Sequence, residues 1–184
     1  MVNIRVMQDK RHSSDGWRVD PSISGGGHFN DISPHQLDIL IDIFGEVERT
    51  SGFSSMYENG DTNTKADDLV TGQIKFSSGV IANGQWYFRA TSALDGEDSC
   101  EIIGEKGIIK FGFFGSLGKI SYRIEDGTEI VEEFPTPKHI QQPMLENVVQ
   151  YFQSEKNAYE NPCSIQDAIV VMKIINSFTA SSPV

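Results

Sequence analysis

Basic residues are scarce in this sequence. Fifteen Lys and Arg stand against 26 Asp and Glu, which gives a formal net charge of −11 at pH 7. The basic residues are scattered and form no cluster. Because nucleic-acid binding needs clustered Lys and Arg against the phosphates, we expect no nucleic-acid partner. The negative charge also disfavours contact with anionic membrane surfaces.

Long apolar runs and cysteines are also scarce. No apolar stretch approaches the roughly 20 residues that a membrane-spanning helix needs, so we expect no membrane segment. Residues 1–10 lack the basic-then-apolar layout of a signal peptide. The two cysteines, Cys100 and Cys163, fit no metal-binding spacing. These features predict a cytoplasmic protein with reduced thiols, with one long-range disulfide as the alternative.

The first quarter of the chain predicts a strand, a loop and a helix. We expect residues 1–184 to form a single domain, because this length suffices for one hydrophobic core. Residues 2–8 alternate between apolar and polar, as a strand does, and residues 9–24 read as a loop. Ser33 and Pro34 resemble a capping box with proline at the first helical position, and Gly45 ends the helix.

The rest of the chain predicts hairpins followed by two helices. The expected strands are 46–56, 68–76, 80–91, 99–104, 107–113, 118–124 and 128–134. The next helix has an apolar stripe of Met144, Leu145, Val148, Val149 and Phe152. Ser164 caps the last helix, whose expected inward residues are Ile165, Ala168, Ile169, Met172 and Ile175. This order predicts an α+β fold, with a mostly antiparallel open sheet and helices on one face.

The other face of such a sheet needs a partner or contact with water. Trp86 and Phe88 occupy one face of the 80–91 strand, and Tyr87 occupies the opposite face. Large side chains on both faces favour a sheet in which a partner covers the face opposite the helices, so we predict sheet-to-sheet dimerisation.

Residues 24–45 carry the candidate chemistry. Gly25, Gly26 and Gly27 would let a substrate approach the main chain, and His28 follows at once. His35 and Asp38 are three residues apart on one helical face, where they can form a hydrogen-bonded acid/base pair. The alternatives are a solvated polar helix face and a glycine hinge without a ligand.

The neighbouring residues allow two interpretations each. Asp31 either caps the backbone amides of the helix or pairs with His35. Trp17 and Arg18 either clamp a phosphate or carboxylate, or form a surface arginine over a buried tryptophan. The glycines are not a dinucleotide fingerprint, because no buried strand precedes them and Asn30 stands at the last glycine position.

These segments together resemble the C-terminal domain of the Gfo/Idh/MocA family, which includes glucose–fructose oxidoreductase and inositol dehydrogenase. The resemblance extends over nearly the whole chain. The residues that carry it are Trp17-Arg18-Val19-Asp20-Pro21, Ser24-Gly25-Gly26-Gly27, Asp31-x₃-His35-x₂-Asp38 and Phe44-Gly45.

The resemblance implies an NAD(P)-dependent oxidoreductase acting on a sugar- or polyol-like alcohol. In that family an N-terminal Rossmann domain binds NAD or NADP and carries a catalytic lysine in Glu-Lys-Pro. The C-terminal domain binds substrate and forms dimers or tetramers through its sheet. By this resemblance His35 is the general acid/base and Asp31 assists it. The implied substrate contacts are Trp17, Arg18, Gly26, Gly27, His28 and Asp38.

The sequence departs from the family in one respect. It contains neither a Rossmann fingerprint nor Glu-Lys-Pro, so nothing in it holds the nicotinamide that hydride transfer needs. We therefore expect the isolated chain to bind no cofactor and to be inactive. Two alternatives remain: a non-catalytic binding or scaffold module, and a metal-dependent hydrolase or isomerase using His28, Asp31 and His35. The spacing of those residues matches no zinc or iron motif, so we assign no metal.

Overall fold

The computed structural model describes residues 1–11, 16–57, 65–115, 117–154 and 164–180. Eight strands and four helices lie in these segments. In chain order they are β1 (Val2–Met7), α1 (Pro21–Ser24), α2 (Gly27–Phe44), β2 (Val47–Ser55), β3 (Leu69–Phe76), β4 (Ile81–Tyr87), β5 (Glu97–Gly104), β6 (Gly107–Phe111), β7 (Lys119–Ile124), β8 (Ile130–Glu133), α3 (Gln142–Gln153) and α4 (Ile165–Thr179).

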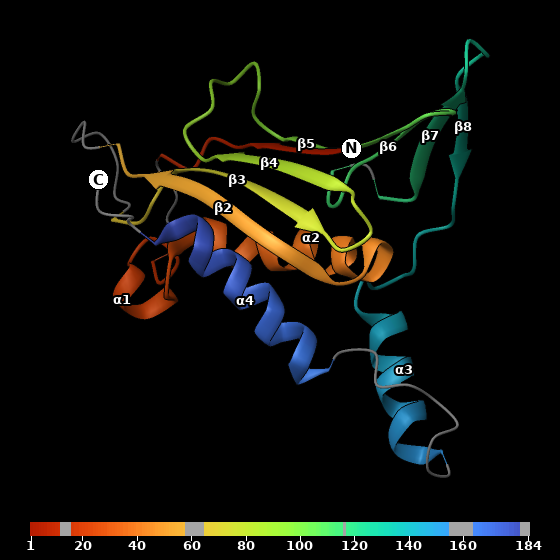
Figure 1. Cartoon of the computed structure of the whole chain (residues 1–184). Helices are drawn as coiled ribbons and strands as arrows, with labels where there is room; N and C mark the ends of the chain where they lie inside the picture. The colour runs from red at the N-terminus through yellow and green to blue at the C-terminus, as the bar shows by residue number, and fades with distance from the viewer. Residues whose placement is uncertain (12–15, 58–64, 116, 155–163, 181–184) are drawn as a thin grey trace.

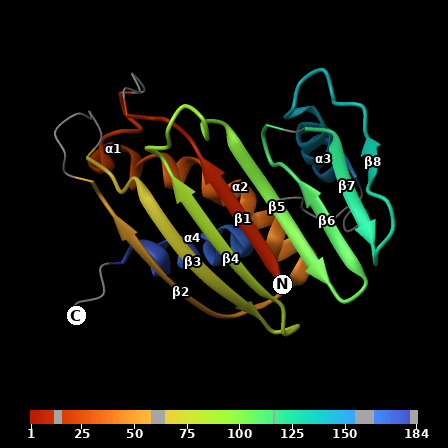
Figure 2. The same cartoon turned by 90° about the horizontal axis from the view of Figure 1, so that it is seen from above.

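The strands form one open sheet in the order β2-β3-β4-β1-β5-β6-β7-β8 (Figure 2). Within the described part of the chain, β1 and β4 alone pair in parallel, and the other neighbouring strands are antiparallel. The parallel pair needs a long connection, which α2, β2 and β3 supply between the two strands. The prediction of a mostly antiparallel open sheet is confirmed.

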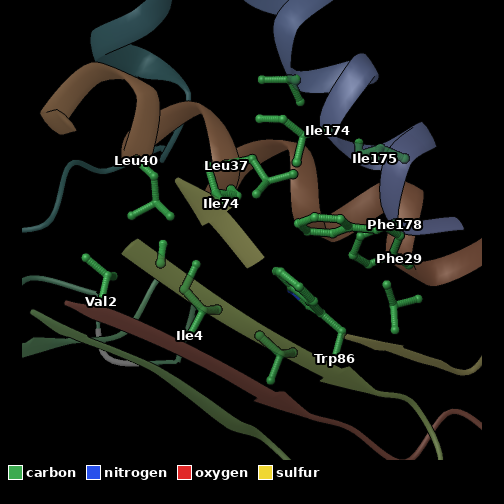
Figure 3. Packing of buried hydrophobic residues seen from close by; sticks show 14 of the residues in the cluster. Val2, Ile4, Phe29, Leu37, Leu40, Ile74, Trp86, Ile174, Ile175 and Phe178 are labelled. Atoms are coloured by element: carbon green, nitrogen blue, oxygen red, sulfur yellow. The ribbon is translucent and has the colours of Figure 1, made fainter. Parts of the chain in front are cut away.

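Helices α2 and α4 cover one face of the sheet (Figure 1). Alternate residues of β1, among them Val2 and Ile4, point into the core between sheet and helices. Leu37 and Leu40 of α2 meet them there together with Ile174 of α4 (Figure 3). The predicted placement of helices on one face is therefore confirmed for α2 and α4.

A row of three glycines makes room for two aromatic rings in this core, those of Phe178 and Trp86. Gly52, Gly72 and Gly84 pair side by side on β2, β3 and β4. A Cβ atom on Gly72 would lie 2.3 Å from the Phe178 ring, which is 1% exposed. The ring centroids of Phe178 and Trp86 are 6.1 Å apart. The absence of side chains along this row lets α4 pack closely on the sheet.

The predicted start of the helix that ends at Gly45, which is α2 in the structure, is wrong. Helix α2 begins at Gly27, so Pro34 lies inside it, and Ser33 is a buried helical residue rather than the cap. The preceding turn includes Phe29, whose side chain is fully buried. Burial of Phe29 offsets the one helical hydrogen bond that proline cannot donate.

The predicted loop over residues 9–24 contains a further departure. Pro21–Ser24 forms the short helix α1, and the Asp20 carboxylate accepts a hydrogen bond from the Ser22 amide at 3.0 Å. Asp20 is therefore an N-cap followed by proline at the first helical position.

The two C-terminal helices also differ from the prediction. Of the five residues predicted to face inward on α4, only Ile175 is buried, and Ile165 is 69% exposed. The buried residues of α4 are Val171, Ile174, Ile175 and Phe178. Because α4 is apolar around much of its circumference, periodicity alone could not select its inner face. The apolar stripe of α3 is largely exposed, and no residue of that helix is buried.

No helix among the described segments combines the length and apolar character needed to cross a bilayer.

Candidate functional site

Arg18 and Asp31 form the best-defined polar contact among the predicted site residues. The Arg18 Nε donates to the Asp31 Oδ2 at 2.8 Å, and both side chains are about one-third exposed. The Arg18 guanidinium also lies over the Trp17 ring, with Cζ 4.3 Å from the ring centroid. Trp17 is 48% exposed, so the alternative of an arginine over a buried tryptophan is wrong. The stack instead presents an aromatic ring and a fixed carboxylate near the start of α2.

The glycine bend before α2 is held by local packing. Gly25 and Gly27 have φ angles of 81° and 75°, which disfavour residues with a side chain. The Ser24 hydroxyl accepts hydrogen bonds from the Gly26 and Gly27 amides at 3.3 and 2.9 Å. A Cβ atom on Gly27 would lie 2.3 Å from Ala66 Cβ. The glycines thus have a structural role in a turn, and Ser24 already binds two of their amides.

His35 lies one helical turn after Asp31, on the exposed side of α2. Its ring meets the Phe114 ring edge to face, with centroids 5.8 Å apart and planes at 86°. Asp31 binds Arg18, and no hydrogen bond between His35 and Asp31 is present among the described residues. The structure therefore leaves the imidazole accessible and uses Arg18 to fix the carboxylate.

Asp38, the predicted partner of His35, lies in acidic surroundings. Burial raises the pKa of the Asp38 carboxyl, and the negative charges of Asp167 and Asp42 raise it further. The nearby His35 has a smaller opposing effect on that pKa. Asp38 thus belongs to an acidic cluster shared by α2 and α4.

Replacing Asp38 by asparagine should stabilise the fold at neutral pH. A carboxyl whose folded pKa is raised favours the folded state below its unfolded value, near 3.8, and loses that contribution as pH rises through the folded pKa. We therefore expect Asp38→Asn to increase the free energy of unfolding at neutral pH, with little effect in acid. Urea unfolding across this range measures the change. Asp126→Asn, at an exposed turn, is the matched control. The same pH dependence of the free energy of unfolding for the parent, Asp38→Asn and Asp126→Asn would contradict the prediction.

His28 does not join His35. Its side chain is 5% exposed, and its ring packs on Phe88 with centroids 5.7 Å apart. Among the described residues, no group of three or more His, Cys, Asp and Glu side chains lies close enough to hold a metal ion. The structure thus gives no support to a metal centre that uses His28, Asp31 and His35.

A buried ion pair beside the sheet was not predicted from the sequence. The Arg89 Nε lies 3.7 Å from the Asp68 Oδ2, and the two side chains are 7% and 3% exposed. The Tyr57 amide donates to the Asp68 Oδ1 at 3.2 Å. Burial raises the pKa of the Asp68 carboxyl, although the Tyr57 amide and Arg89 oppose the change. Arg89 alternates with the core residues Trp86 and Phe88 in the sequence of the expected 80–91 strand, so no local signal marked it as buried.

A buried amide network next to His35 was also missed. The Trp86 Nε1 donates to the Gln36 Oε1 at 2.6 Å, and Gln36 Nε2 lies 3.5 Å from the Asp98 Oδ1 as donor. The Asp98 Oδ2 accepts hydrogen bonds from the backbone amides of Phe114 and Gly115. The only local signal was a polar Gln36 beside the core residue Leu37.

The chain is similar to known protein sequences. A profile described as the GFO/IDH/MocA C-terminal domain matches residues 1–110. Oxidoreductase P35 from Formosa agariphila is 38% identical over 162 residues, which are 88% of this chain and 46% of that protein. The chain thus spans about half the length of this curated relative.

Solved structures share the fold at low sequence identity. The aldose-aldose oxidoreductase of Caulobacter crescentus, solved with glycerol, has a TM-score of 0.73 and 18% identity over 96% of this chain and 52% of that one. Levoglucosan dehydrogenase, solved with NADH and levoglucosan, has a TM-score of 0.74 and 18% identity over 96% of this chain and 54% of that one. A Synechocystis biliverdin reductase, solved with biliverdin and NADP⁺, has a TM-score of 0.74 and 12% identity over 95% of this chain and 52% of that one.

Proposed function

Because this chain belongs to the GFO/IDH/MocA family of oxidoreductases and carries its C-terminal domain, we propose a function within an enzyme of that family. The chain is the substrate-binding and oligomerisation domain of an NAD(P)-dependent oxidoreductase. That enzyme acts on a sugar- or polyol-like alcohol in the cytoplasm. The observation that carries it is the accessible His35, one turn from an Asp31 carboxylate that Arg18 fixes.

His35 is the proton carrier in this proposal. An imidazole can take the proton of a substrate hydroxyl near neutral pH, when the carbon–hydrogen bond of the same carbon is broken. Asp31 is held by Arg18 at 2.8 Å and has a second carboxylate oxygen that can accept a hydrogen bond from the substrate. His35 and Asp31 thus bind and orient the alcohol from one helix.

The glycine bend does not fit a dinucleotide pyrophosphate. Such a site needs free backbone amides at a helix N-terminus, whereas Ser24 binds the Gly26 and Gly27 amides. When NAD or NADP is bound, it supplies the hydride acceptor. We therefore assign its binding to a separate Rossmann domain and derive no step of hydride transfer from this chain.

The exposed stripe of α3 supports a domain partner. Leu145, Val149 and Phe152 are 54%, 50% and 80% exposed, and Glu146 is the charged residue of this helix. A helix of this length is marginal in water without packing on an apolar face. Relatives are about twice as long as this chain, which leaves room for another domain. We assign the stripe to the contact with the Rossmann domain.

Activity of the joined and separate parts tests the proposed function. We expect the chain joined to a Rossmann domain of its family to reduce NAD or NADP with at least one member of a sugar and polyol panel. The isolated chain should be inactive in the same assay. Turnover by the isolated chain would contradict this division, and a folded but inactive joined protein would favour the scaffold alternative.

The uncovered face of the sheet supports self-association. A ladder of amide side chains crosses it, with Gln73 Nε2 donating to Asn83 Oδ1 at 2.9 Å and Asn83 Nδ2 donating to Asn3 Oδ1 at 3.3 Å. Phe53 on neighbouring β2 is 76% exposed on this face. Paired amides and an exposed aromatic ring suit a partner surface more than contact with water.

Phe53→Glu should separate the copies. We expect light scattering at micromolar concentration to show dimers or larger assemblies of the parent chain. Phe53→Glu should be monomeric, because assembly would bury the new carboxylate in the contact between copies without a partner of opposite charge. Ile130→Glu on the edge strand β8 is the control and should leave the assembly intact. A monomeric parent chain would count against the proposal.

A further inference from the structure

We propose that Asp98 is a positioning residue for His35. In this inference, Asp98 fixes the segment Phe113–Gly115 so that the Phe114 ring stands against the His35 imidazole. The functional meaning rests on the proposed acid/base role of His35. The structural claim can be tested without any measurement of activity.

Both oxygens of the Asp98 carboxylate accept hydrogen bonds. Asp98 lies on β5 and is paired in register with Val6, on the helix-covered face of the sheet. Its Oδ2 accepts hydrogen bonds from the Phe114 amide and, at 3.1 Å, from the Gly115 amide. Its Oδ1 accepts one from the Gln36 Nε2 at 3.5 Å. A carboxylate that accepts several N–H groups is a strong anchor for the backbone that donates them.

The orientation of the Gln36 amide is determined by the core. The Gln36 side chain is fully buried, and its Oε1 accepts a hydrogen bond from the Trp86 Nε1 at 2.6 Å. Because the indole N–H can only donate, the Gln36 oxygen must face Trp86 and the NH₂ group must face Asp98. The network therefore runs in one direction, from Trp86 through Gln36 to Asp98.

This network lies directly beneath the candidate proton carrier. His35 precedes Gln36 on α2, and the two side chains leave the helix in different directions. Gln36 is buried, whereas His35 is exposed and meets Phe114 with ring centroids 5.8 Å apart. Phe114 is itself 43% exposed, so burial alone does not hold its ring. The Asp98 anchor supplies the restraint and makes Phe114 a wall beside the imidazole.

The directions of these hydrogen bonds predict a charge-exchange rescue. In Asp98→Asn, the remaining side-chain oxygen can still accept the hydrogen bonds from the Phe114 and Gly115 amides. The new NH₂ group then faces the Gln36 NH₂ group, so two donors oppose each other. In Gln36→Glu, two carboxylates face each other. The double variant restores donor against acceptor. The carboxylate that replaces the Gln36 amide then accepts from Trp86 and from the NH₂ group that replaces one Asp98 oxygen.

The test is the NMR signal of the His35 imidazole in the full 184-residue chain at neutral pH. His35→Gln assigns the signal by its disappearance. Phe114→Leu removes the aromatic ring at a partly exposed site and gives the reference position without ring contact. We expect Asp98→Asn and Gln36→Glu each to move the His35 signal to that reference position. The double variant should return it toward the parent position.

Two results would overturn the inference. One is a folded Asp98→Asn chain with an unchanged His35 signal, and the other is a folded double variant whose signal stays displaced. If a single variant does not fold, the His35 signal of the double variant decides: a return toward the parent position supports the inference, and a displaced signal contradicts it. A double variant that also fails to fold counts against the rescue. A loss of the acid/base assignment would leave this structural result standing, so the two failures are distinguishable.

Discussion

Replacing His35 by alanine is expected to lower kcat of the joined oxidoreductase by about 10²–10⁴-fold, the usual contribution of a positioned general acid or base. Cofactor affinity should change little, because the dinucleotide is assigned to the other domain. Steady-state kinetics at saturating NAD or NADP, with cofactor titration, measure both quantities. We expect the loss because the imidazole is exposed on α2, where a substrate hydroxyl can reach it.

Asp42→Ala is the matched control for His35→Ala. Asp42 is also an exposed residue of α2, and it stands outside the proposed substrate contacts. We expect this variant to keep the parent kcat. Equal kcat values for the parent and His35→Ala would remove the acid/base assignment and favour the scaffold alternative.

Gly72→Ala is expected to lower the free energy of unfolding by about 1–3 kcal/mol, as overpacking of a core does. The added Cβ atom would lie 2.3 Å from the Phe178 ring. That ring has little room to move, since a Cβ on Gly52 would also lie 2.7 Å from its Cδ1 atom. Urea unfolding of the purified chain measures the loss.

Two further variants locate the cause of that loss. Gly16→Ala adds the same methyl group where none of the residues that the structure describes lies within 4 Å, and should change stability by less than about 0.5 kcal/mol. Phe178→Leu shortens the colliding side chain, so Gly72→Ala should cost less in that background than in the parent. Additive losses would mean that the ring and the glycine row do not interact as described.

The sheet was predictable because its strands carry a local signal. Val70, Ile74 and Phe76 alternate with polar residues on β3, and all three are buried. The start of α2 was not predictable from local signals, since Ser33-Pro34 matches a helix start in sequence. The burial of Phe29, which depends on distant strands, decides it instead.

The inner face of α4 shows the same limit. Ile169 and Ile174 are both good core residues by sequence, but the first is 47% exposed and the second 1%. The choice depends on Gly52 of β2 and Gly72 of β3, which leave room for the Phe178 ring on one side of the helix. No pattern within α4 carries that information.

The candidate site was partly visible in the sequence. The sequence suggested a pairing of Asp31 with His35 but placed Asp31 before the helix, whereas the structure places both residues on α2. The Arg18 partner of Asp31 is 13 residues away, across the glycine bend, and Asp98 is 62 residues from Gln36. Such contacts arise only when the chain folds, so the predicted His35–Asp38 pair missed the acidic surroundings that Asp167 gives Asp38.

Rescue by added imidazole tests the role of His35 most directly. In a folded His35→Gly variant of the joined protein, we expect turnover to be low and to rise with imidazole concentration, while the parent protein shows no such increase. Free imidazole would then perform the proton transfer that the missing side chain performs. A His35→Gly variant that turns over like the parent without imidazole would contradict the account.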